Sequence, residues 1–142
     1  MTVALTRSQL RQTVMTVVNK IVADHTSYPL KVETANRDPI DHATQSGPYL
    51  QVVVAPMHGE QAELGRNAAV KYEGQILISA VVKDGAGTVD AEELIDFVLP
   101  YFSEQTLGVL QCQAAYPAGG RAHGGLWYES LIVPYFYFSK PV

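Results

Sequence analysis

Residues 126–138 read LWYESLIVPYFYF, and they determine what kind of sheet this chain must build. The stretch holds six aromatic rings and one proline, and its single charge is Glu129. Because β-branched and aromatic residues favour strands, the stretch is predicted to be one long strand. Side chains alternate between the two faces of a strand, so neighbouring rings point in opposite directions and one core cannot bury them all.

The rings of this strand have two interpretations. They are either core and half-buried strand residues, or part of the strand lies in an interface between subunits. Tyrosine is enriched at interfaces because its ring is apolar while its hydroxyl finds a polar partner. We therefore favour an interface, and the candidate contacts are Trp127, Tyr128, Tyr135 and Tyr137.

Four earlier segments are also predicted to form strands. They are residues 28–36, 49–56, 68–84 and 109–116, in which apolar and polar residues alternate or apolar residues run together. Within the third segment, Gly74 predicts a bulge or a close approach of another group to the backbone. Residues 37–48, 56–67 and 117–125 are rich in glycine, proline or polar residues and are predicted to be loops.

Two segments show the periodicity of amphipathic helices. The first runs from Thr6 to about His25, and Thr6 with Gln9 fits a capping box. The second begins near Thr88 or Asp90, and Pro100 is expected to kink or end it near Leu99. The apolar stripes are Leu10, Val14, Val17, Val18, Ile21 and Val22 in the first helix and Ala91, Leu94, Ile95 and Val98 in the second.

The order of these elements predicts the fold class. The 142 residues fit one domain, 1–142, with an α+β fold. We expect two helices packed on one face of a mostly antiparallel sheet of about five strands, as a single pair of layers. A chain of this length has no third layer to cover the other face, so we expect that face or an edge to meet another subunit.

Composition limits the function classes. The net charge is −4 and the cations are scattered singly, which argues against specific nucleic-acid binding. The lone Cys112 excludes an internal disulfide and a CxxC zinc site, and we interpret it as a small buried hydrophobe. No apolar run has the length of a membrane span and no export signal is visible, so we expect assembly in a cytoplasm and no membrane partner.

Candidate chemistry is sparse. The four histidines are scattered, and His42 with Asp38 and Asp41 is the nearest approach to a metal cluster. The acidic residues 90–93 are better explained as partners of a helix dipole than as catalytic carboxylates. The glycine-rich residues 117–125 lack the spacing of a phosphate loop. We therefore expect no enzyme activity, catalytic residue, cofactor or metal.

Taken together, the elements resemble the small tail-terminator (tail completion) proteins of long-tailed bacteriophages. The resemblance spans residues 8–138. It is carried by the helix SQLRQTVMTVVNKIV, the strand segments YPLKVETANRD and GPYLQVVVAP, the long strand YEGQILISAVVKDGAGT, the helix AEELIDFVLPYF, and YPAGG and GGLWYES before the aromatic closing strand.

The resemblance implies a structural virion protein rather than an enzyme. Such proteins form a hexameric ring at the head-proximal end of the tail tube, where the ring stops polymerisation of the tube protein. The ring also gives a docking surface to head completion or neck proteins, and genomic DNA passes through its centre. On this basis we expect the long loops 37–48 and 56–67 at the ring edges, and the candidate tube or neck contacts are Arg66, Asn67, Arg121 and His123.

Three alternatives stay open at this point. The first is a head–tail connector or neck subunit, stacked one layer nearer the head. The second is a small ligand-binding α+β module or enzyme, which would require a pocket with convergent polar groups. The third is an unrelated cytoplasmic oligomerisation module.

Overall fold

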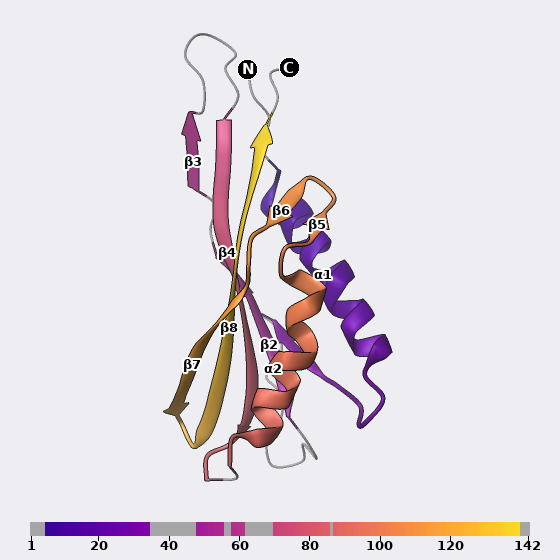
Figure 1. The fold of residues 1–142 in the computed structure, drawn as a ribbon, viewed down its shortest axis with the longest axis vertical. Helices are drawn as coiled ribbons and strands as arrows, with labels where there is room; N and C mark the ends of the chain where they lie inside the picture. The colour runs from indigo at the N-terminus through magenta and orange to yellow at the C-terminus, as the bar shows by residue number, and fades with distance from the viewer. Residues whose placement is uncertain (1–4, 35–47, 56–57, 62–69, 86, 140–142) are drawn as a thin grey trace.

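The computed structural model describes residues 5–34, 48–55, 58–61, 70–85 and 87–139. In these ranges two helices lie on one side of a long, twisted sheet, so the fold is α+β (Figure 1). The elements in chain order are α1 (Arg7–Asp24), β1 (Val32–Thr34), β2 (Tyr49–Val54), β3 (His58–Gln61), β4 (Val70–Lys83), α2 (Val89–Phe102), β5 (Thr106–Leu107), β6 (Leu110–Cys112), β7 (Tyr116–His123) and β8 (Leu126–Ser139).

The sheet is mixed but mostly antiparallel. Its main path runs β1-β2-β4-β8-β6-β5, while β3 pairs with β4 and β7 pairs with β8. Within the described ranges only β1 and β2 are parallel to each other. β4 and β8 are each fourteen residues long and pair over their full length, from Val70 opposite Ser139 to Lys83 opposite Leu126.

The predicted class and the placement of both helices on one face are confirmed, but the predicted number of about five strands is wrong. The described sheet has eight strands, because short and glycine-rich segments also pair. β3 lies inside the predicted loop 56–67, and the predicted strand 109–116 is divided between β6 and the start of β7. Backbone pairing needs no apolar pattern, so periodicity alone does not reveal such strands.

The main core lies between the sheet and the helices. Ile76 and Ile78 of β4 and Leu131 and Val133 of β8 point into it and are completely buried. The helices contribute Leu10, Val14, Val18 and Ile21 from α1 and Ala91, Leu94, Ile95, Val98 and Phe102 from α2. The two predicted helical stripes are therefore confirmed as core, with Val17 and Val22 at its margin.

The helix ends follow the sequence in one case and depart from it in the other. The capping box of α1 is present, because the Gln9 amide donates to Thr6 Oγ1 at 3.1 Å and the Thr6 amide donates to Gln9 Oε1 at 2.9 Å. α2, in contrast, continues past Pro100 to Phe102. Pro100 falls in the last turn, where a missing donor costs one hydrogen bond, and burial of Phe102 holds that turn against the sheet.

The prediction of a loop over residues 117–125 is wrong, because most of this segment forms β7, which pairs with β8. Gly124 and Gly125 both have positive φ, 60° and 78°, as a two-residue turn of type I′ requires. Such a turn matches the twist of the two strands and closes the hairpin directly. The glycines that indicated a loop are therefore the residues that make the hairpin possible.

Gly74 allows a close approach, as one of the two sequence-based interpretations predicted. It lies opposite Tyr135 on the neighbouring strand, and a Cβ atom at Gly74 would lie 2.6 Å from the Tyr135 hydroxyl oxygen. Real Cβ atoms do not come that close to another heavy atom. The Tyr135 ring therefore occupies the space that a side chain at residue 74 would need.

We expect Gly74→Ala to lower the free energy of unfolding by about 1–3 kcal/mol, because the added methyl group overpacks the core against Tyr135. Urea unfolding followed by circular dichroism measures this loss. Gln75→Ala is the matched control, since residue 75 is the exposed neighbour on the same strand. Equal losses for the two variants would contradict the steric explanation.

Candidate functional site

The face of the sheet opposite the helices, called the outer face here, carries an apolar row. Paired residues on neighbouring strands point to the same face of a sheet. Val53 pairs with Leu77, Leu77 with Ile132, and Ile132 with Tyr116, so the four side chains form one row across β2, β4, β8 and β7. We call these four residues the outer row. Val53 is 38% exposed and Tyr116 is 45% exposed, and the two central members are half-buried.

Aromatic residues extend the apolar surface along β8. Phe136 and Phe138 lie on the outer face, with ring centroids 5.9 Å apart in an edge-to-face arrangement. Phe138 is 48% exposed. The Lys71 ammonium group lies 5.1 Å from the centre of the Phe136 ring and 3.9 Å from a carboxylate oxygen of Glu73. This end of the outer face is therefore apolar with a charged rim.

The opposite end of the outer face is partly closed. Tyr49, Val81 and Leu126 are buried there, and Tyr128 packs against them as a second, smaller apolar cluster. Between this cluster and the outer row, the hydroxyls of Ser79 and Ser130 are 3.0 Å apart. In the described part of the chain neither helix covers the outer face (Figure 1), so the outer row stays accessible.

Two of the predicted interface residues need correction. Tyr135 and Tyr137 are only 1% and 3% exposed, and both belong to the core beneath the helices. The Tyr137 hydroxyl accepts a hydrogen bond from the Leu5 amide at 2.8 Å, and its ring stacks on Tyr72. Buried in their own chain, they have no surface to offer to another subunit. The sequence pattern showed that they share a face but not which face it is.

The other two predicted interface residues are half-buried at the hairpin. The Trp127 indole lies against Gly120 on β7, and its nitrogen donates to Glu129 Oε1 at 2.7 Å. Tyr128 points to the outer face, where the guanidinium carbon of Arg121 lies 5.7 Å from its ring centre. Trp127 thus packs on the helix-facing side of the hairpin, and Tyr128 belongs to the outer face.

Of the predicted tube or neck contacts, Arg121 and His123 lie on β7, whose eight residues are all exposed. β7 pairs with β8 along one edge. Among the described strands no other pairs with it, so its second edge is unpaired within the described ranges. The other predicted contacts, Arg66 and Asn67, lie outside the described residues, and so do Asp38, Asp41 and His42.

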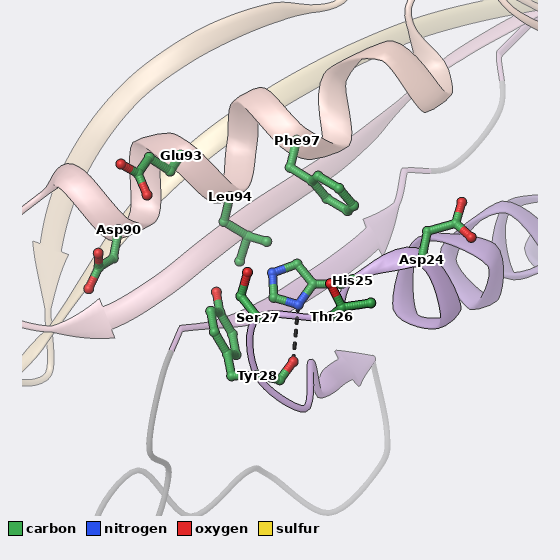
Figure 2. Close-up of a pocket in the computed structure, with 9 residues that line it drawn as sticks. All are labelled: Asp24, His25, Thr26, Ser27, Tyr28, Asp90, Glu93, Leu94 and Phe97. Carbon is green, nitrogen blue, oxygen red and sulfur yellow. Dashed lines mark hydrogen bonds between the residues drawn. The ribbon is translucent and has the colours of Figure 1, made fainter.

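Sequence analysis missed a cleft between the helices. It has a volume of about 270 Å³ and lies between the end of α1 and the first turns of α2 (Figure 2). Its walls are Asp24, His25, Thr26, Ser27, Tyr28, Asp90, Glu93, Leu94 and Phe97. His25, one of the four histidines that are scattered along the sequence, is half-buried here. The one sequence feature that marks this cleft is the group of acidic residues at the start of α2, which the sequence analysis explained as partners of the helix dipole.

Aromatic rings and carboxylates meet in this cleft. The His25 ring packs edge-on against Tyr28 and Phe97, with centroid distances of 4.4 and 5.3 Å, and its Nδ1 lies 3.0 Å from the Tyr28 carbonyl oxygen (Figure 2). Burial raises the pKa of the Tyr28 hydroxyl, and the negative charges of Asp90 and Glu93 raise it further. The cleft therefore presents negative charge beside aromatic surface.

Metal ligation, membrane crossing and thiol reactivity can each be judged from the described residues. They contain no group of three or more His, Cys, Asp or Glu side chains arranged to hold a metal ion. Neither described helix is long and apolar enough to cross a bilayer. Cys112 is buried, and burial raises the pKa of its thiol to about 11, so the thiol stays protonated at neutral pH.

Comparison with known proteins gives a match in fold and none in family. No family model matches the chain, and no curated protein matches it. Several solved structures match, and one of them, of a protein whose name carries no functional information, is similar with a TM-score of 0.59 and 16% sequence identity. The match covers 98% of this chain and 99% of the other. At this identity the similarity shows the fold alone.

We expect Tyr135→Phe to raise the free energy of unfolding at pH 7 by about 1 kcal/mol, because a buried hydroxyl without a partner costs more than no hydroxyl. The Tyr135 hydroxyl has no hydrogen-bond partner among the described residues. Urea unfolding of both proteins checks this difference. Tyr116→Phe is the control, since Tyr116 is exposed.

Tyr135→Phe should also make the free energy of unfolding less sensitive to alkaline pH. Burial, with smaller effects from Tyr137 and Cys112, raises the pKa of Tyr135 from 10.0 to about 12. Between these values the unfolded chain ionises first, so the native protein loses stability as the pH rises, by about 1.4 kcal/mol per pH unit at most. The advantage of Tyr135→Phe over the wild type should therefore grow above pH 10. An advantage that stays constant up to pH 12 would contradict this assignment.

Proposed function

We propose that this chain is a tail-terminator subunit of a long-tailed bacteriophage. Copies of it close into a ring, hexameric as in the family it resembles, at the head-proximal end of the tail tube. The ring stops addition of tube protein and offers its far side to head completion or neck proteins, while genomic DNA passes through the centre. The subunit acts in the virion after assembly in the host cytoplasm.

The observation that carries this proposal is the outer row, Val53, Leu77, Ile132 and Tyr116, on the sheet face opposite the helices. Apolar surface that crosses four strands in one row is typical of a protein interaction site. Subunits of a ring repeat one contact between two different patches until the ring closes. The outer face supplies one such patch, and a neighbouring copy supplies the other.

The described surface also fits a subunit that binds protein rather than DNA. The net charge of the chain is −4, whereas proteins that bind DNA use clusters of Lys and Arg to contact the phosphates. A mildly acidic ring lets DNA pass without adhesion. The exposed strand β7, which carries Arg121 and His123, is the described surface that we assign to contacts with protein partners, neighbouring copies of this chain included.

Arrest of tube growth is the direct test of the proposed role. Purified chain is added to polymerising tail-tube protein, and tube length is measured by electron microscopy. We expect arrest at far fewer copies of this chain than of tube protein, because only the growing end is capped. Tubes of unchanged length would exclude a terminator. A head–tail connector, the nearest alternative, would leave tube length unchanged and bind only to finished ends.

We expect Val53→Asp to abolish arrest of tube growth, because a carboxylate in the outer row opposes burial between copies. Val53 is already 38% exposed, so the free energy of unfolding should change by less than about 1 kcal/mol. Val109→Asp is the matched control, since Val109 is 57% exposed in the turn between β5 and β6. Equal loss of arrest in both variants would contradict a specific role for the outer row.

A further inference from the structure

The β7–β8 hairpin and the helix cleft lie at the same end of the molecule but on opposite sides of it. Figure 1 shows the hairpin on the side away from the helices, and the start of α2 with the end of α1 on the helical side. When copies are related by rotation about a ring axis, surfaces on opposite sides at one level face each other. The hairpin of one copy can therefore meet the cleft of the next copy.

The two surfaces carry opposite charges that have no partner within the described chain. The only ion pair among the described residues joins Lys71 and Glu73. Arg121 is exposed on β7, where its guanidinium group lies over the ring of Tyr128. On the cleft side, Asp90 and Glu93 are exposed and have no cation beside them in the described ranges.

The chemistry of the cleft matches an arginine side chain in two ways. A guanidinium group binds carboxylates through several hydrogen bonds, and it also stacks on aromatic rings. The cleft offers the carboxylates of Asp90 and Glu93 together with the rings of His25, Tyr28 and Phe97, around a volume of about 270 Å³. A cationic group placed there meets both kinds of partner at once.

We infer that Arg121 of one copy enters the α1–α2 cleft of the next copy, where it pairs with Glu93 and Asp90 and packs against the aromatic rings. This inference rests on the proposed ring and names the contact that orders its subunits. Val89, the first residue of α2, is 63% exposed near the cleft and gives the incoming hairpin an apolar contact. The contact joins two different patches, so it propagates from copy to copy in one direction.

Charge reversal tests the contact in the full-length chain. Arg121→Glu and Glu93→Arg should each abolish association when measured alone by sedimentation velocity. Association should return when the two variants are mixed in equal amounts, because every hairpin then finds a cleft of opposite charge in an alternating ring. The double variant, which carries both changes in one chain, should associate without a partner.

Two control variants separate the contact from general charge effects. Glu92→Arg also reverses a charge in the first turn of α2. Glu92 does not line the cleft, however, and its carboxylate accepts a hydrogen bond from the Thr88 hydroxyl. Arg11→Glu reverses an exposed charge on α1. Both controls should associate like the wild type. Thermal unfolding confirms that all the variants are folded.

A peptide provides a second test that does not depend on the phage role. The probe is an acetylated peptide of residues 118–125, added to the full chain carrying Arg121→Glu, whose own hairpin cannot compete. We expect saturable binding by calorimetry, weakened at least about tenfold by Glu93→Arg in the chain or by Arg121→Gln in the peptide.

Either a peptide that does not bind or a mixture of reversed variants that stays apart would overturn this inference. Neither result depends on the tube protein. A chain that passes both tests but leaves tube growth unchanged would instead reject the terminator role and keep the contact between copies.

Discussion

Fourteen residue pairs between β4 and β8 join the two longest strands of the sheet. β2 and β3 attach to β4, and β6 and β7 attach to β8, so both halves of the sheet are built on this one pairing. Its register also assigns each side chain to a face. A slip of β8 by one residue would move Leu131 and Val133 out of the core and bring the polar Ser130 into it. The core and the outer face are therefore fixed together.

The features that the sequence predicted are those that depend on local pattern. The spacing of apolar residues in both helices, the Thr6 capping box and the long strand with its close approach at Gly74 are all confirmed. Each is set by residues near one another in the chain or by the period of one element. The proposed terminator role still depends on the resemblance and on the experiments above.

The features that the sequence did not predict depend on partners far away in the chain. Alternation on β8 placed Tyr135 and Tyr137 on one face, but only the packing of the helices makes that face the core. The strand β7 was read as a loop because its glycines look unstructured without the Trp127 ring that covers Gly120. The cleft joins His25 to Phe97, two residues that no sequence period connects. Such contacts become visible only once the fold is known.

The central position of β8 has a consequence for how the chain reaches its fold. β8 is the last of the described elements in the chain, yet it separates β4 from β6 and β7 in the sheet. Its hairpin with β7 closes through two glycines, whereas the contact between Val70 and Ser139 spans 69 residues. Loop closure makes the second step slower. During synthesis β4 therefore lacks its longest neighbour until β8 leaves the ribosome and pairs with β4 on one side and with β6 and β7 on the other.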